Sequence, residues 1–342
     1  MAHRVGNGTI ILDNPVFIKA FASVVSKKES EGPLKDYFDK INLDMMFGEE
    51  SWEKAESVLQ KTAANICIEK SNLRETDIDC MFAGDLLNQC IGSTYGLRDL
   101  SIPFLGLYGA CSTMAEGLSL ASLFCESGAA KNALALTSSH FCSSERQFRF
   151  PLDYGSQRPP TSQWTVTGSG AVILTTDEKT ALPLKIDSIC FGKIIDLGIT
   201  DINNMGAAMA PAAADTLFSY LSDTSTTPDD YDLIITGDLG AIGSDLFSSL
   251  MEEKGVSLND KHRDCGLLIF DRDKQDTHSG GSGCGCSASV LCSYILKSME
   301  RGDFRNILFM ATGALMSTVS NQQSETIPSI AHLLRIRRKD KQ

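Results

Sequence analysis

One ten-residue pattern occurs twice in the chain, as Asp77-Ile-Asp-Cys-Met-Phe-Ala-Gly-Asp-Leu86 and as Asp230-Tyr-Asp-Leu-Ile-Ile-Thr-Gly-Asp-Leu239. Five of the ten positions are identical, and most of the others are apolar in both copies. A short apolar run that ends in a Gly-Asp pair is typical of a buried β-strand followed by a turn. The pattern therefore predicts two equivalent strands, one in each half of the chain.

A second pair of motifs follows these strands in the same order. Cys111 and Cys286 each precede a serine and begin an apolar stretch with helical spacing, which ends at a glycine before a further apolar run. Cys111 lies 26 residues before Thr137, and Cys286 lies 26 residues before Thr312. Two motif pairs with the same order and spacing indicate an internal duplication.

We expect each half to be an α/β unit. Helices between strands imply right-handed crossovers and parallel strands covered on both faces. Ser51 is expected to begin an amphipathic helix, with residues 205–221 as its counterpart and Pro211 breaking or bending the early part. The predicted halves are residues 1–180 and 181–342. Residues 141–164 exceed an ordinary connection, which predicts a functional or disordered loop.

Composition excludes several classes of protein. The length of 342 residues suits about two units of ~150 residues. The net charge is −12 and the pI is near 4.9, which argues against nucleic-acid binding. No uninterrupted apolar stretch approaches ~18 residues, and no secretory signal is visible, so we expect neither a membrane span nor secretion. The eleven cysteines lie scattered in apolar segments, which favours a reducing, intracellular location.

Cys111 is the first candidate for chemistry. It lies in Tyr108-Gly-Ala-Cys-Ser-Thr-Met114, at a predicted strand-to-helix turn. The helix N-terminus and its free N–H groups favour a thiolate there. That position suits a nucleophile or an anion-binding turn without chemistry, and the alternative is a buried cysteine that only packs.

The duplicated α/β unit with Gly-Ala-Cys-Ser before its central helix resembles the thiolase and ketoacyl-synthase superfamily. More narrowly, the chain is similar to the stage V sporulation protein AD family over nearly its whole length. The motifs that carry this resemblance are Glu31-Gly-Pro-Leu34, Phe82-Ala-Gly-Asp-Leu-Leu-Asn-Gln89, Gly109-Ala-Cys-Ser-Thr113, Thr137-Ser-Ser-His140, Glu145-Arg-Gln-Phe-Arg149, Val166-Thr-Gly-Ser-Gly-Ala-Val172, Ile195-Asp-Leu-Gly-Ile-Thr-Asp201, Met209-Ala-Pro-Ala-Ala-Ala-Asp215 and Gly280-Gly-Ser-Gly-Cys284.

The resemblance implies a thiolase-like fold, a duplicated five-layer αβαβα arrangement with two mostly parallel mixed sheets. It implies a subunit that binds dipicolinic acid (pyridine-2,6-dicarboxylate), free or as its calcium chelate, without a further cofactor. Its expected partners are the integral-membrane channel proteins of the spore, and thiolase relatives suggest a homodimer. The expected location is the forespore cytoplasm and then, peripherally, the inner spore membrane. A solvated chain end is the preferred explanation of the short basic C-terminus, and weak attraction to anionic lipid is the alternative.

The catalytic set of a thiolase-type enzyme is incomplete in this sequence. Such enzymes pair their cysteine with histidine or asparagine from the C-terminal half. Neither residue stands at Gly237-Asp238-Leu239 or in the glycine-rich residues 280–286, and residues 312–316 lack a second cysteine. An anionic Asp238 would also oppose an oxyanion. A binding protein is therefore the first hypothesis, an acyltransferase with Cys111 as nucleophile the alternative, and a scaffold without a ligand the third.

A dicarboxylate ligand needs cationic or N–H donors around a flat apolar space. His140 follows a predicted strand, and arginines cluster just after it. We therefore expect Arg146 and Arg149 to clamp the carboxylates while the Cys111 turn offers N–H groups. The expected ligand-binding residues are Cys111, His140, Arg146, Arg149, Asp238, His262, Ser282 and Cys284, with Arg158 as a further anion-binding candidate. No metal site is expected, because the spacing of 262–265 with 284–286 fits no common zinc pattern.

Overall fold

The computed structural model describes residues 1–148 and 158–339. Its large mixed sheet contains two sets of five strands, which we call the first and second half-sheets. The first half-sheet consists, in spatial order, of β5 (Phe104–Leu107), β4 (Cys80–Gly84), β6 (Asn132–Ser139), β8 (Gly168–Thr175) and β2 (Thr9–Val25). The second consists of β11 (His262–Asp264), β10 (Leu233–Thr236), β13 (Asn306–Ala314), β14 (Ser329–Arg338) and β9 (Leu184–Phe191).

The two half-sheets have the same topology. In the first, β5, β4 and β6 are parallel, and β8 is antiparallel to both β6 and β2. In the second, β11, β10 and β13 are parallel, and β14 is antiparallel to both β13 and β9. Four of the five strands in each half-sheet thus run in one direction. The two copies of the ten-residue pattern form β4 and β10, which confirms the duplication at the level of topology.

Strand β2 joins the half-sheets into one hydrogen-bonded sheet. Its residues 17–25 pair with β8, and its earlier residues 9–17 pair with β9. Two short strands, β1 (His3–Val5) and β3 (Lys40–Ile41), also pair with β2. The predicted pair of sheets is therefore present as two topologically equivalent halves of a continuous sheet.

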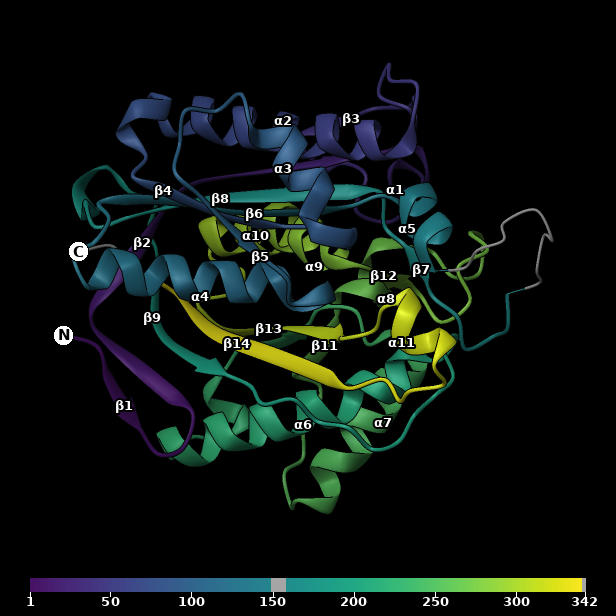
Figure 1. Cartoon of the computed structure of the whole chain (residues 1–342). Helices are drawn as coiled ribbons and strands as arrows, with labels where there is room; N and C mark the ends of the chain where they lie inside the picture. The colour runs from purple at the N-terminus through teal and green to yellow at the C-terminus, as the bar shows by residue number, and fades with distance from the viewer. Residues whose placement is uncertain (149–157, 340–342) are drawn as a thin grey trace.

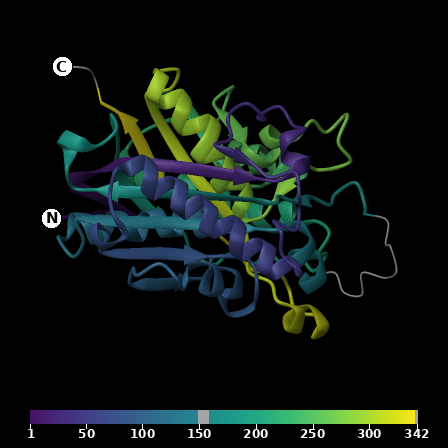
Figure 2. The ribbon, with the colours of Figure 1, turned by 90° about the horizontal axis from the view of Figure 1, so that it is seen from above.

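Helices form the other three layers (Figure 1). Helices α2 (Trp52–Ser71) and α3 (Ile91–Leu97) cover the outer face of the first half-sheet, and Figure 2 shows α2 lying over its strands. Helices α6 (Met205–Thr224) and α7 (Gly240–Glu253) cover the outer face of the second. The middle layer contains α4 (Thr113–Glu126), α9 (Cys284–Val290) and α10 (Leu296–Arg301), the last two joined by a π-helical turn.

The local sequence explains these helices. Ser51 accepts a hydrogen bond from the backbone N–H of Lys54 and caps α2, as predicted. Helix α6 continues through Pro211 rather than breaking there. Every residue of α9 is buried, because this helix lies between the two half-sheets. Its small Cys, Gly, Ser and Ala side chains permit close packing.

Short elements gather at the end of the molecule opposite both chain termini (Figure 1). They are α1 (Lys27–Ser30), α5 (Phe141–Phe148), α8 (Cys265–Ile269), α11 (Thr318–Gln322) and a two-stranded ribbon of β7 (Trp164–Thr165) and β12 (Gly281–Ser282). The prediction of a loop from residue 141 was wrong for its first eight residues, which form α5. Carboxyl ends of the parallel strands meet at this end, where ligand sites of α/β proteins commonly lie. Within residues 1–148 and 158–339, no helix is long and apolar enough to span a membrane.

Candidate functional site

The turn that carries Cys111 connects the edge strand β5 to the middle-layer helix α4. Residues 110–112 form a single 3₁₀ turn before α4, and Ala110 has a φ of +48°. A positive φ is uncommon for a residue other than glycine and marks a sharp change of chain direction. The predicted strand-to-helix turn is confirmed. Cys111 is buried in it, with a relative exposure of 5%.

Asp238 lies next to Cys111 but comes from the second half, two residues after the end of β10. Its carboxylate accepts hydrogen bonds from the Thr312 hydroxyl (2.8 Å), the Ser282 hydroxyl (3.2 Å) and the Gly283 N–H (3.0 Å). The Cys111 thiol lies close enough to this carboxylate for each group to shift the pKa of the other. Three donors thus hold a fully buried acid beside the cysteine.

This arrangement keeps the Cys111 thiol protonated. Burial raises the pKa of Cys111 well above its ordinary value, and the charge of Asp238 raises it further. Burial also raises the pKa of Asp238 to about 6, although its hydrogen bonds act in the opposite direction. The prediction of a thiolate was wrong, because burial and the neighbouring carboxylate outweigh the dipole of α4.

Two further predicted residues lie beside Cys111. Cys284 packs with Cys111 and Leu86 in one apolar cluster, and its thiol donates to the carbonyl of Ser138 at 2.9 Å. Ser282 bonds Asp238 from the β12 strand. The structure thus brings Cys111, Asp238, Ser282 and Cys284 together at the interface between the two halves.

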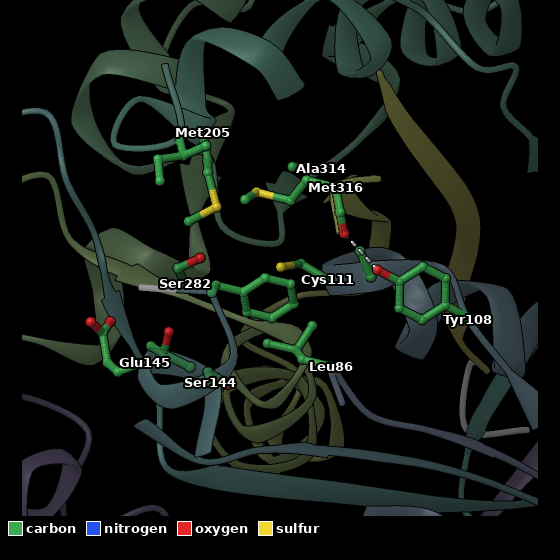
Figure 3. Close-up of a pocket in the computed structure, with 13 residues that line it drawn as sticks. Leu86, Tyr108, Cys111, Ser144, Glu145, Met205, Ser282, Ala314 and Met316 are labelled. Atoms are coloured by element: carbon green, nitrogen blue, oxygen red, sulfur yellow. Dashed lines mark hydrogen bonds between the residues drawn. The ribbon is translucent and has the colours of Figure 1, made fainter. Parts of the chain in front are cut away.

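A cavity opens in front of Cys111 (Figure 3). Its free volume is about 50 Å³, which is room for a few water molecules. The Tyr108 hydroxyl donates to the Met316 carbonyl at 3.1 Å at one side, and the Met205 side chain lies on another. The lining residues are Leu86, Tyr108, Ala110, Cys111, Ser144, Glu145, Phe148, Thr165, Ile202, Met205, Ser282, Ala314 and Met316. Among these described residues the lining is mainly apolar, and Glu145 carries its only formal charge at neutral pH.

The two predicted histidines lie elsewhere. His140 follows β6 as expected, but its Nε2 bonds the Met45 carbonyl at 2.9 Å and its Nδ1 accepts from the Cys142 N–H. His262, on β11, bonds the Thr236 hydroxyl through Nε2 at 2.9 Å and packs edge-on against Phe247. Burial lowers the pKa of both imidazoles, that of His262 to about 4. Neither residue lines the cavity.

The structure describes two of the three arginines that the sequence suggested as anion-binding residues. Arg146 pairs with Glu53 of α2 and lies over the Trp52 ring, 5.2 Å from its centroid. Arg149 lies outside the described residues. Arg158 bonds the carbonyl and the carboxylate of Asp276 and lies outside the cavity lining. The ligand-binding roles of these arginines stay predictions.

Sequence reasoning missed several residues that the fold brings to the cavity. Ser144 and Phe148 lie four residues apart on α5, a helical spacing that could have indicated a common face. Ile202 and Met205 precede or begin α6, and no local motif marks them. Within residues 1–148 and 158–339, no group of three or more His, Cys, Asp or Glu side chains is arranged to hold a metal ion.

Comparison with known proteins gives the same fold and a narrower family. The family model of stage V sporulation protein AD matches residues 6–337. The stage V sporulation protein AD of Bacillus subtilis (strain 168) is 47% identical over 327 residues, covering 96% of each chain. Among solved structures, the 3-oxoacyl-[acyl-carrier-protein] synthase III of Aquifex aeolicus VF5 aligns with a TM-score of 0.56 at 14% identity, over 94% of this chain and 99% of its own. A variant of Xanthomonas campestris OleA aligns with a TM-score of 0.62 at 12% identity, over 96% and 99%.

The structural neighbours confirm the thiolase-like fold, and at these identities they show the fold alone. The match over residues 6–337 and the 47% identity extend through both halves and include the Cys111 turn, the Gly-Asp pairs and the glycine-rich segment before α9. The chain belongs to the stage V sporulation protein AD family and is a sporulation protein.

Proposed function

We propose that this chain binds pyridine-2,6-dicarboxylate, preferentially as its calcium chelate, in the cavity beside Cys111 and without catalysing a reaction. The main observation that supports this proposal is the buried pair of Cys111 and Asp238, which lies where a condensing enzyme needs a reactive thiol. Membership of a sporulation protein family supports the choice of this spore dicarboxylate, which the sequence motifs already suggested.

The contacts of the cysteine support a role in binding. A nucleophilic cysteine needs a low thiol pKa and a base or cation beside it. All five histidines lie in the described part of the chain, and none is a partner of the Cys111 thiol. His3, His140, His262, His278 and His332 bond instead to Asp13, Met45, Thr236, Asp276 and Gly192, respectively. The group beside the sulfur is a carboxylate, which disfavours both a thiolate and an oxyanion.

The lack of a cationic side chain among the described lining residues favours the chelate over the free dianion. Glu145 and Asp238 lie at or beside the cavity, and no lysine, arginine or histidine is among its described lining residues. The described lining residues offer a dianion no opposite charge, whereas its complex with Ca²⁺ is neutral and brings oxygen ligands with it. The ligand therefore needs no calcium cage from the protein.

The ligand requires the cavity to widen, since a pyridine ring with two carboxylates exceeds the space of a few water molecules. Met205 and Met316 border the cavity, and unbranched methionine side chains adopt alternative rotamers readily. Movement of these two side chains would open the space in front of Cys111.

Calorimetric titration with the calcium chelate tests this proposal. Ala314→Met fills the cavity from β13, and we expect it to weaken binding at least tenfold. Ala129→Met adds the same side chain at an exposed position and is expected to bind as the wild type does. Equal affinity in all three proteins would contradict the assignment of the cavity.

The alternative function is acyl transfer with Cys111 as the nucleophile. The location of this cysteine at a strand-to-helix turn inside a cavity favours it. Incubation with an acyl-CoA followed by intact-mass measurement distinguishes the two functions. Non-catalytic binding predicts an unchanged mass, and an acyl adduct that disappears in Cys111→Ser would establish the enzyme.

The proposed partners are the integral-membrane proteins of the spore dicarboxylate channel, with uptake during sporulation and release during germination as the process served. The proposed location is the forespore cytoplasm and then the inner spore membrane as a peripheral subunit.

A homodimer is a further proposal, supported by the position of β5 at the sheet edge with Phe104 40% exposed. Light scattering during size-exclusion chromatography tests it, with Phe104→Glu expected to give a monomer.

A further inference from the structure

Two cations lie over the ring of Trp164, outside the cavity. The Lys28 ammonium is 3.8 Å from the ring centroid, and the Arg158 guanidinium carbon is 4.7 Å from it. The Phe141 ring stacks on the same indole at 3.7 Å and 5°, so it occupies one face. Both cations therefore share the other face, where they are close neighbours of like charge.

This cluster lies directly behind the cavity. Trp164 and Thr165 form β7, and Thr165 lines the cavity. Because successive side chains of a strand point to opposite faces, Trp164 points away from it. Phe141 begins α5, whose later residues Ser144 and Phe148 also line the cavity. The cluster and the cavity thus share the same two elements.

One hydrogen-bond donor of the cluster has no partner among the described residues. Arg158 places Nη2 on the carbonyl and carboxylate of Asp276, while its Nη1 is buried and has no hydrogen-bond partner. The Asp276 side chain is 76% exposed and also bonds His278. Burial and the charge of Arg158 lower the pKa of Lys28, although the carboxylates of Asp276, Glu29 and Glu31 act in the opposite direction. A buried guanidinium N–H without an acceptor is costly, and an anion between the two cations would satisfy it.

We propose that Lys28, Arg158 and Trp164 form a second site that binds a carboxylate of a small organic acid. The acceptor that Arg158 already holds is a carboxylate, and the free Nη1 and the Lys28 ammonium offer donors for two oxygens of another. This proposal rests on the function proposed above and deepens it, because the described lining of the cavity presents no cation to the dicarboxylate. The cluster supplies such cations on the other face of the β7–β12 ribbon.

Trp164 itself reports binding. The chain has two tryptophans, so Trp52→Phe leaves Trp164 as the single fluorophore. In that background we expect isophthalate and pyridine-2,6-dicarboxylate to change the Trp164 emission saturably. Arg158→Gln and Lys28→Gln are each expected to weaken this response at least tenfold. Lys27→Gln is the matched control, since it removes an exposed neighbouring charge that makes no contact with the ring, and it is expected to leave the response unchanged.

Three results would overturn the inference: no saturable response, an equal loss in Lys27→Gln, or a response to inorganic phosphate but to neither carboxylate. Calorimetry separates this inference from the proposed function. If the calcium chelate binds equally well to the wild type and to Arg158→Gln but not to Ala314→Met, the cavity is the site and the second site is wrong. If Trp164 responds while Ala314→Met and the wild type bind alike, the second site stands and the cavity assignment fails.

Discussion

Asp238 is the residue that most changes the chemistry of this fold. A neutral donor beside a cysteine would tolerate a thiolate, whereas a carboxylate held by Thr312, Ser282 and Gly283 opposes one. Asp238→Asn removes the charge and should therefore lower the pKa of the Cys111 thiol. The rate of Cys111 alkylation by iodoacetamide, followed across pH by peptide mass spectrometry, measures that shift.

Asp85 offers a matched control, because it is the equivalent buried acid of the other half. It accepts hydrogen bonds from Ser93 and Leu87, and it is not among the groups with the largest effect on the pKa of Cys111. Asp85→Asn should leave the alkylation profile of Cys111 unchanged. A profile that moves equally in both variants would mean that Asp238 has no specific effect on the thiol.

For single residues, the sequence identifies candidate site residues that follow strand ends. It does not identify the contact partner of a side chain when that partner is distant in the chain. Cys111, Asp238, Ser282 and Cys284 could be predicted because they follow or begin repeated elements. The partner of Arg146 could not, because Glu53 lies on α2 and is 93 residues away. His140 and His262 likewise have ordinary positions in sequence, and only the tertiary contacts show that their imidazoles serve the packing.

Among the elements, β13 fits against the Cys111 turn without spare room. A Cβ on Gly313 would lie 2.4 Å from the carbonyl oxygen of Gly109 and 3.1 Å from the N of Ser112. Gly313→Ala should therefore displace the turn and destabilise the protein by about 1–3 kcal/mol in urea unfolding. Weaker binding of the calcium chelate should accompany this change.

Gly117→Ala is the comparison for that variant. Gly117 lies in α4, and the contacts of an added Cβ begin at 3.5 Å, which is ordinary van der Waals distance. Because alanine favours a helix over glycine, we expect unchanged stability or a gain of up to about 1 kcal/mol. A loss in Gly117→Ala as large as that in Gly313→Ala would show that the tight approach at Gly313 is not the cause.

His262 on strand β11 should make the stability of the protein depend on pH. Burial lowers the pKa of His262 to about 4, below the ordinary 6.5, so the unfolded chain takes up this proton first. The contribution of the neutral His262 side chain to the free energy of unfolding is full above about pH 6.5 and is lost as the pH falls toward 4. His262→Gln should give a shallower decline of the unfolding free energy over this range than the wild type. The exposed His3→Gln should keep the wild-type decline, and identical slopes in all three proteins would contradict the assignment.

The elements were partly predictable. The ten-residue pattern identifies β4 and β10 because burial and the Gly-Asp turn impose the same residues on both. The helical character of residues 141–148 was missed, since α5 has few apolar residues and gains its stability from packing beside the cavity. The pairing of β2 with both β8 and β9 depends on registers between distant segments, which no local pattern specifies.

For the whole molecule, the shared strand β2 has a thermodynamic consequence. Because its two parts belong to the two half-sheets, neither half can separate without breaking the pairing of β2. The two halves predicted from the sequence, residues 1–180 and 181–342, should therefore not unfold independently. Scanning calorimetry should show one transition whose calorimetric and van't Hoff enthalpies agree, whereas two resolved transitions would mean independent halves.

The duplication also explains where the cavity lies. The carboxyl ends of the parallel strands of both halves lie at the same end of the molecule, so Cys111, after β5 of the first half, and Asp238, after β10 of the second, meet at the interface. The most direct measurement is a crystal structure of the protein grown with the calcium chelate of pyridine-2,6-dicarboxylate. We predict ligand density in front of Cys111, with Met205 or Met316 moved aside and the Cys111–Asp238 contact intact. An unchanged cavity, with the chelate bound elsewhere or a covalent group on Cys111, would contradict this account.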